Sequence, residues 1–116
     1  MRKTNSTNTI NSQNLNESCG TANALSLIGG RWKLTIIWRL ANGKMRYGAL
    51  RDSIPLISER MLVQQLRELE RDGLVTRIVY PQVPPRVEYE VTENSLELIP
   101  IIQSLSEWGE KQLVNL

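Results

Sequence analysis

The chain has 116 residues and a mass of 13.3 kDa, which is enough for one domain. Histidine is absent and Cys19 is the only cysteine, which excludes a Cys/His zinc site within one chain, an intrachain disulfide and histidine-dependent nucleophilic catalysis. We therefore expect no catalytic residue, no metal and no cofactor. Apolar runs fall short of the roughly 18 residues of a membrane span, and the unpaired thiol, with no export signal, favours a reducing cytoplasm.

The net charge of +2 is small, but the charges are unevenly distributed. Residues 31–46 carry five basic side chains and no acidic one, whereas residues 87–116 carry six acidic side chains and one basic side chain, Lys111. This division predicts one region that faces a polyanion and another with a different role, although a short chain also produces such a split by chance.

The first elements follow from composition and from apolar spacing. Residues 1–17 are rich in asparagine, serine and threonine, and they predict a disordered tail before one domain over residues 18–116. Apolar residues at three-residue steps before Gly29-Gly30 predict a short helix over residues 19–28. Trp32, Ile36 and Leu40 lie at i, i+4 and i+8, so they predict a second helix, which ends at Asn42-Gly43.

The middle of the chain predicts two consecutive helices. Residues 44–46 are expected to form a short strand or an extended linker. A third helix begins at Tyr47 and ends before Ile54-Pro55, because the residue before proline avoids helical angles. Ser58 is a suitable N-cap for a fourth helix over residues 59–72, with Gly73 after its end.

The last third predicts a hairpin and a final helix. Residues 75–80 and 86–91 have the composition of strands, and the proline-rich residues between them form a stiff, exposed loop. Thr92 caps a last helix that reaches about Leu113, and Pro100 requires that this helix begin late or bend. The fold class is therefore mainly α with a small β-hairpin, in the order α-α-(β)-α-α-β-β-α.

The helix predicted over residues 59–72 has two chemically different faces. At 100° per residue its leucines lie together and its arginines and Gln64 lie opposite them. Arginine binds guanine bidentately and glutamine binds adenine, while Val63 would contact a thymine methyl group and Glu59 would accept from cytosine N4. The alternative is an amphipathic helix whose charged face is only solvated and carries i,i+4 ion pairs.

The surrounding elements favour recognition of DNA. A short helix, a turn and a longer polar-faced helix form a helix-turn-helix, and the following hairpin is then a wing whose arginines meet phosphates or the minor groove. A phosphate contact and a half-buried position are equally compatible with Tyr47. The candidate DNA-binding residues are Arg46, Tyr47, Ser58, Glu59, Arg60, Val63, Gln64, Arg67, Arg71, Arg77 and Arg86, and Arg51 is expected beside the backbone.

The last helix carries more apolar residues than a small domain can cover. The surplus predicts a subunit interface, whereas the alternative is one core that absorbs the whole stripe. The candidate interface residues are Leu25, Leu98, Ile101, Ile102, Leu105 and Trp108. A two-fold dimer would separate two recognition helices by about 34 Å, one turn of DNA.

Five blocks of sequence, together with Cys19 and Trp108-Gly109, resemble the HxlR-type winged helix-turn-helix regulators. The blocks are residues 29–34 (GGRWKL), 46–50 (RYGAL), 57–62 (ISERML), 65–75 (QLRELERDGLV) and 80–89 (YPQVPPRVEY). The resemblance spans about residues 19–109 and implies a bacterial homodimeric transcription factor, distantly similar to MarR-type proteins, that binds a palindromic operator in double-stranded DNA. The chain has Gly20 where the family usually has proline and Ser95 where it usually has glycine, and neither lies in the recognition helix.

The resemblance also bears on control. Some HxlR-type proteins sense electrophiles or oxidants through such a thiol, which makes Cys19 a candidate redox switch; the alternative is a small side chain that fills a niche. Because a dimer bound at a promoter blocks it, the expected direction is repression. The competing hypothesis is a winged-helix protein–protein module that does not bind DNA. A small electrophile or ligand is a further expected partner.

Overall fold

The computed structural model describes residues 19–114, so the tail predicted over residues 1–17 lies outside the described residues. The chain divides into two compact units, Met1–Gly30 and Arg31–Leu116. In the first unit residues 19–28 are helical, as predicted. The amide of Gly29 donates to the carbonyl oxygen of Leu25 over 2.7 Å, and a side chain at this position would collide with that oxygen. Glycine therefore allows the helix to end there.

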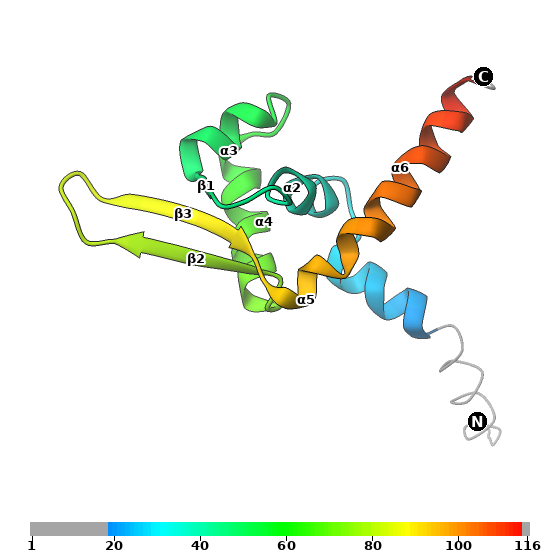
Figure 1. The fold of residues 1–116 in the computed structure, drawn as a ribbon, viewed down its shortest axis with the longest axis horizontal. Coiled ribbons are helices and arrows are strands. Elements are labelled where there is room, and N and C mark those ends of the chain that lie inside the picture. Colours follow the sequence, from blue (N-terminus) through cyan, green and yellow to red (C-terminus); the bar gives the residue numbers. More distant parts are fainter. Residues whose placement is uncertain (1–18, 115–116) are drawn as a thin grey trace, which may run out of the picture. The chain divides into compact units, whose positions relative to one another are not determined.

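The second unit contains five helices and three strands among its described residues (Figure 1). The elements are α2 (Lys33–Arg39), β1 (Met45–Arg46), α3 (Tyr47–Ser53), α4 (Glu59–Arg71), β2 (Val75–Tyr80), β3 (Arg86–Val91), α5 (Glu93–Leu96) and α6 (Leu98–Val114). The predicted fold class, mainly helical with a small sheet, is confirmed. Residues 45–46 are a strand rather than a linker, and both hairpin strands have the predicted bounds.

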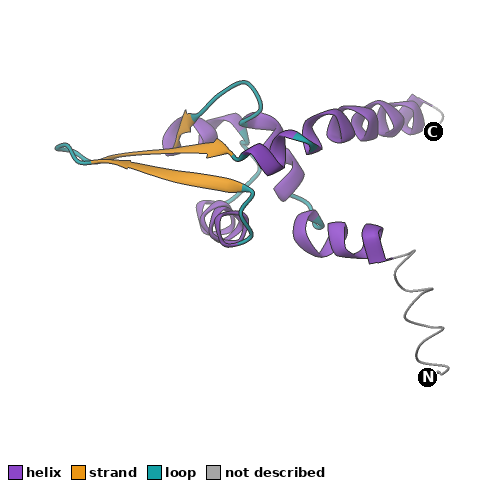
Figure 2. Cartoon of the chain, turned by 60° about the horizontal axis from the view of Figure 1, so that its bottom comes forward, coloured by secondary structure: helices purple, strands orange, loops and turns teal. Residues whose placement is uncertain are grey.

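The three strands form one antiparallel sheet in the order β1-β3-β2. Val75 pairs with Val91 at one end of the hairpin and Tyr80 with Arg86 at the other, and residues 81–85 between the strands are all exposed. The hairpin projects away from the helices of this unit, and α6 extends on the opposite side (Figures 1 and 2). Only the base of the hairpin is therefore supported by helices.

Helix α2 lies at the centre of the core. It contacts α3, α4 and α6, and its Ile36 and Ile37 are fully buried. The leucines of α4 pack inward, so the apolar face predicted for this helix is confirmed. The other buried apolar residues of the second unit are Leu40, Leu50, Ile54, Ile57, Leu62, Leu66, Leu69, Leu74, Val75, Tyr89 and Ile102.

The segment after β3 is two helices rather than one. Thr92 caps α5, because its side-chain oxygen accepts from the backbone N–H of Ser95 over 3.3 Å. The chain turns at Glu97 and α6 begins at Leu98, which places Pro100 in the first turn of α6. Amides in a first turn have no partner within the helix, so proline is tolerated there. The helical segment thus begins directly after Thr92 and is interrupted at Glu97, before Pro100, so neither a late start nor a bend at Pro100 describes it in full.

Candidate nucleic-acid interface

Helices α3 and α4 and the turn between them form the helix-turn-helix. Ser58 precedes α4, and its side-chain oxygen accepts from the backbone N–H of Met61 over 3.1 Å, as expected for an N-cap. Gly73 follows α4 with φ +75°, a conformation that favours glycine. These local signals explain why the predicted bounds of α4 agree with the observed ones to within one residue.

The face of α4 opposite its buried leucines is polar and exposed. Arg60, Gln64, Arg67 and Arg71 all lie on this face, as predicted, and Val63 is half-buried at its edge. Leucine burial on one side thus determines which side chains point to solvent. The rotation of α4 therefore leaves its arginines and Gln64 exposed, as the sequence predicts.

Four predicted DNA-binding arginines lack a carboxylate partner. Within residues 19–114, no carboxylate lies within 4.0 Å of Arg46, Arg60, Arg67 or Arg77. Arg60 and Arg67 lie on α4, Arg46 on β1 and Arg77 on β2, and all four are exposed. An exposed guanidinium without an internal partner loses only hydrogen bonds to water when it binds a phosphate or a base edge, because no ion pair within the chain has to be broken.

Glu59 connects α3 with α4. Its carboxylate accepts from the hydroxyl of Tyr47 over 3.3 Å and lies 3.5 Å from Nη1 of Arg51. Burial raises the pKa of Tyr47, and the charge of Glu59 adds to the effect. Tyr47 is half-buried, which was one of its two predicted positions. If Glu59 accepts from cytosine as predicted, the base must compete for its carboxylate with Tyr47 and Arg51.

Two further side chains of the polar face of α4 bind carboxylates of their own chain. Nε and Nη2 of Arg71 donate to the two carboxylate oxygens of Asp72 over 3.0 and 3.1 Å. These hydrogen bonds are the main reason why the pKa of Asp72 is lowered. Nε2 of Gln64 donates to Glu68 over 3.3 Å. The polar face of α4 is therefore partly ordered before any ligand binds.

A cluster of polar side chains occupies the outer end of the hairpin; we call Lys44, Tyr80, Arg86 and Glu88 the wing cluster. The hydroxyl of Tyr80 donates to Glu88 over 2.9 Å and accepts from Nζ of Lys44 over 3.2 Å. The hydrogen bond between Lys44 and Tyr80 is the main reason why the pKa of Lys44 is raised. The guanidinium of Arg86 stacks 3.9 Å from the ring of Tyr80 and lies 3.6 Å from Glu88.

The wing cluster changes the interpretation of Arg86. This residue was predicted to be a wing contact, but its Nε is buried and makes no hydrogen bond, because 3.6 Å to Glu88 is too long. Sequence reasoning missed Lys44, Tyr80 and Glu88. The strand alternation that places Arg86 and Glu88 on one face was a usable signal, whereas nothing local in the sequence points to Lys44.

Arg67 of α4 and Arg77 of β2 line the same hollow, which has a volume of about 360 Å³ and also includes Val63, Glu70 and Tyr89. As an arginine of the predicted wing, Arg77 was expected near the stiff tip of the hairpin. In the observed register Arg77 pairs with Tyr89, three residues before the end of β2, so that placement is wrong. Two guanidinium groups from different elements therefore face one hollow between helix and wing.

The arrangement of helix-turn-helix and hairpin agrees with a comparison of the sequence with known families. Residues 27–115 match the HxlR-like helix-turn-helix family. The chain belongs to this family. The match includes both helices of the helix-turn-helix and the whole hairpin.

Relatives of this HxlR-like chain share both its sequence and its fold. The HTH-type transcriptional regulator YdeP of Bacillus subtilis is 48% identical over 95 residues, which are 82% of this chain and 74% of YdeP. The redox regulator HypR in its oxidized form is 47% identical with a TM-score of 0.75, over 80% of this chain and 96% of that one. The reduced form of YodB from B. subtilis is 37% identical with a TM-score of 0.69, over 78% and 88%. The HxlR-like chain is thus an HTH-type transcriptional regulator.

Helix α6 of this HxlR-like chain exposes a large apolar surface. Among its residues, Ile101, Leu105 and Trp108 have exposed fractions of 59%, 51% and 61%. Leu25, on helix 19–28, is also exposed. Ile102 was expected at the subunit interface but is buried in the core of its own chain, while Leu98 is half-buried. No helix within residues 19–114 is long and apolar enough to cross a membrane.

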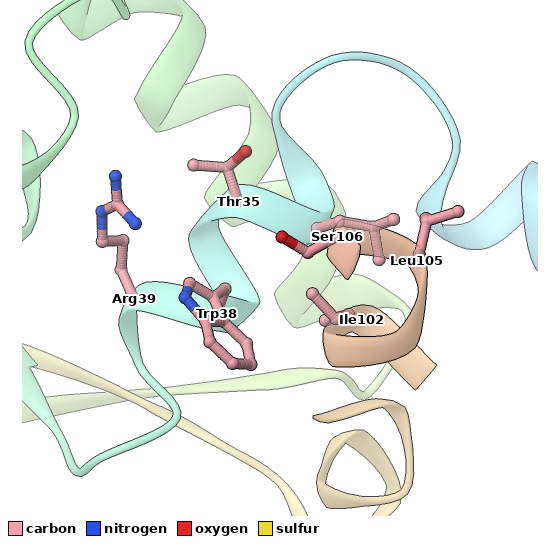
Figure 3. A pocket seen from close by; sticks show the side chains of 7 residues that line it. Thr35, Trp38, Arg39, Ile102, Leu105 and Ser106 are labelled. Atoms are coloured by element: carbon pink, nitrogen blue, oxygen red, sulfur yellow. The ribbon is translucent and has the colours of Figure 1, made fainter. Parts of the chain in front are cut away.

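A groove of about 300 Å³ lies between α2 and α6 (Figure 3). Leu34, Trp38, Ile102 and Leu105 supply apolar walls, and the polar members are Thr35, Arg39 and Ser106. The groove continues the exposed apolar surface of α6 toward α2.

The thiol of Cys19, in the other unit, is exposed and unpaired.

Proposed function

We propose that this HxlR-like chain is a dimeric, sequence-specific regulator that binds double-stranded DNA, with α4 in the major groove and the β2–β3 hairpin as the wing. The observation that carries the proposal is the set of exposed arginines without a carboxylate partner on α4, β1 and β2, described above. Their positions fit the docking of a recognition helix and the phosphate contacts around it.

The contacts divide into two kinds. Arg60 and Gln64 lie near the N-terminal half of α4, whose residues reach base edges when such a helix enters the major groove. Arg67 and Arg77 share the hollow between helix and wing, where the phosphate backbone between the two grooves would pass. The proposed DNA-binding surface also includes Arg46, Tyr47, Ser58 and Val63. Arg71 and Arg86 would contact DNA only after they lose contacts with Asp72 and with Tyr80 and Glu88.

Dimerisation through α6 is the second part of the proposal. Its exposed apolar side chains form a surface that monomeric proteins rarely leave uncovered. A second copy of this chain is the proposed occupant, because a palindromic operator requires two recognition helices related by a two-fold axis. We expect Trp108→Glu to yield a monomer in sedimentation equilibrium and to abolish tight binding to a palindrome, whereas Val83→Glu on the hairpin loop leaves the dimer intact.

Oxidation of Cys19 is the proposed signal, supported by the similarity to the redox regulator HypR and by the exposure of the thiol. Two Cys19 thiols of one dimer and one molecule of hydrogen peroxide would give one disulfide and two molecules of water, with the sulfur atoms losing two electrons. An electrophile such as a quinone would alkylate the same thiolate. The idea fails if peroxide and quinone leave the affinity for DNA unchanged in both the parent and Cys19→Ser.

The decisive experiment measures binding to random duplex DNA at several salt concentrations, followed by selection of bound genomic fragments with and without oxidant. DNA binding predicts an affinity that falls steeply with salt, because phosphate contacts release counterions. The selection identifies the operator, and its position relative to promoters tests repression. A chain that binds no duplex at any salt concentration would instead be a winged-helix protein–protein module.

A further inference from the structure

One carboxylate connects a buried lysine with a proposed base-reading side chain. Nζ of Lys33, at the start of α2, donates to Oε1 of Glu68 over 2.6 Å. Nε2 of Gln64 donates to the other oxygen, Oε2, over 3.3 Å. The side chain of Lys33 is only 9% exposed and that of Glu68 is 28% exposed. Each oxygen of Glu68 therefore has a different donor, one from the core and one from the exposed face of α4.

Lys33 determines where the carboxylate lies. A buried ammonium group without a partner is strongly unfavourable, so the ion pair restrains the side chain of Glu68. The hydrogen bond from Lys33 is the main reason why the pKa of Glu68 is lowered, and the hydrogen bond from Gln64 adds to it. At neutral pH Glu68 is ionised, as a glutamate of ordinary pKa already is. An ionised carboxylate accepts hydrogen bonds and donates none.

This property selects one orientation of the Gln64 amide. Only its NH₂ group can face Glu68, because the flipped amide would bring its carbonyl oxygen against a carboxylate oxygen. One N–H and the carbonyl oxygen of Gln64 remain available to a ligand. This is the donor and acceptor pair that adenine requires at N7 and at its N6 amino group. Ordering a side chain in advance also lowers the entropy lost on binding.

We propose, on the basis of the DNA-binding function above, that Glu68 is a positioning residue that orients Gln64 to read adenine, and that Lys33 holds Glu68 in place. Neither residue needs to contact DNA. Among residues 19–114, no carboxylate lies within 4.0 Å of Arg60 or Arg67, which lie on the same face of α4. The preference for one base thus depends on a lysine that belongs to the core.

The test uses the full chain and a library of duplexes with randomised base pairs. Selection with the parent defines a preferred duplex, and Gln64→Ala identifies the adenine position that this residue reads. We expect Glu68→Gln to lower the preference for adenine at that position by about fivefold or more, out of the roughly 5- to 150-fold that one bidentate contact supplies. In Glu68→Gln the carbonyl oxygen stays with Lys33 and the NH₂ group faces Gln64, so the variant no longer selects the orientation in which Gln64 donates to residue 68.

Two controls separate positioning from charge and from folding. Glu70→Gln removes the same charge from the same helix, and it should raise the affinity for all duplexes alike without changing the base preference. The double variant Lys33→Met with Glu68→Met replaces the ion pair by apolar side chains, which proteins usually tolerate, and it should relax the same base preference as Glu68→Gln. Urea midpoints verify that each variant is folded.

The proposal also predicts a dependence between two substitutions. In a Gln64→Ala background, Glu68→Gln should have no further effect on base preference, because it acts only through Gln64. An effect that persists in this background, or an effect equal to that of Glu70→Gln, would overturn the role of Glu68 and leave the DNA-binding function standing. A parent chain that enriches no sequence from the library would overturn both.

Discussion

On α4, Arg60 and Arg67 are exposed with no carboxylate within 4.0 Å in the described part of the chain, whereas at the outer end of the hairpin Arg86 stacks on Tyr80 beside Glu88. In the proposed complex the first two would lose only contacts with water, while Arg86 would have to give up its contacts with Tyr80 and Glu88. The difference teaches that arginines of equal charge differ in what surrounds them: those of α4 are free for the proposed DNA contacts, whereas that of the wing is held within the hairpin.

The largest contrast concerns packing. Leu66 on α4 is buried, and Leu66→Ala should lower the free energy of unfolding by about 2–5 kcal/mol, because it leaves a cavity in the core. Val83 on the hairpin loop is 99% exposed, and Val83→Ala should change the free energy of unfolding by less than about 0.5 kcal/mol. Urea denaturation followed by tryptophan fluorescence measures both. Equal losses would show that the wing loop packs against another surface.

The next effect concerns base recognition. Arg60→Ala should weaken binding to the preferred duplex by about 1–3 kcal/mol and relax the preference at one base pair. The loss on random duplex should be smaller, because only a base contact depends on sequence. Titrations of both duplexes at one salt concentration measure the difference. If both affinities fall equally, Arg60 contacts only the backbone.

The wing cluster should affect binding through shape. Glu88→Gln removes the charge between Lys44 and Arg86, so we expect it to lower the free energy of unfolding by about 1 kcal/mol and to speed amide hydrogen exchange in β2 and β3. Affinity for all duplexes should fall without a change in salt slope. Glu90→Gln, on the same strand and exposed, is the matched control. A salt slope that falls with Glu88→Gln would contradict this role.

Arg77 tests the hollow between helix and wing. Arg77→Ala should weaken binding to all sequences similarly and lower the salt slope by about one unit, as the loss of one phosphate contact predicts. The measurement is the affinity for random and preferred duplexes at four salt concentrations. A loss confined to the preferred duplex would assign Arg77 to base recognition instead.

The smallest contrast is in the response to pH. The pKa of Glu68 lies below its ordinary value of 4.5, so its stabilising contribution is present above pH 4.5 and is lost as the pH falls through the lowered pKa. The pKa of Lys44 lies above its ordinary value of 10.5, so its contribution is present below pH 10.5 and is lost as the pH rises through the raised pKa. Amide chemical shifts near Glu68 should change only below pH 4.5, and those near Lys44 only above pH 10.5. Simultaneous changes in both regions would indicate global unfolding.

The sequence by itself determined most of the elements and their order, although it predicted one helix where α5 and α6 are observed. Apolar spacing, Ser58 and Gly73 predict α4 because these signals act within a few residues, and alternating residues predict β2 and β3 for the same reason. The two faces of α4 also follow from its sequence, since leucine burial sets the rotation of the helix. The family resemblance, carried by short blocks, was confirmed by the match to residues 27–115.

Only the tertiary structure decided which charges are paired and which apolar residues are left over. Lys33 and Glu68 are 35 residues apart, and their ion pair depends on how α2 packs on α4. Packing also buries Ile102 within its own chain and leaves Trp108 exposed, although both lie on one predicted stripe. Apolar periodicity predicts the direction in which a side chain points from its own helix. Whether that side chain forms an ion pair or is buried depends on which residues of another element lie beside it.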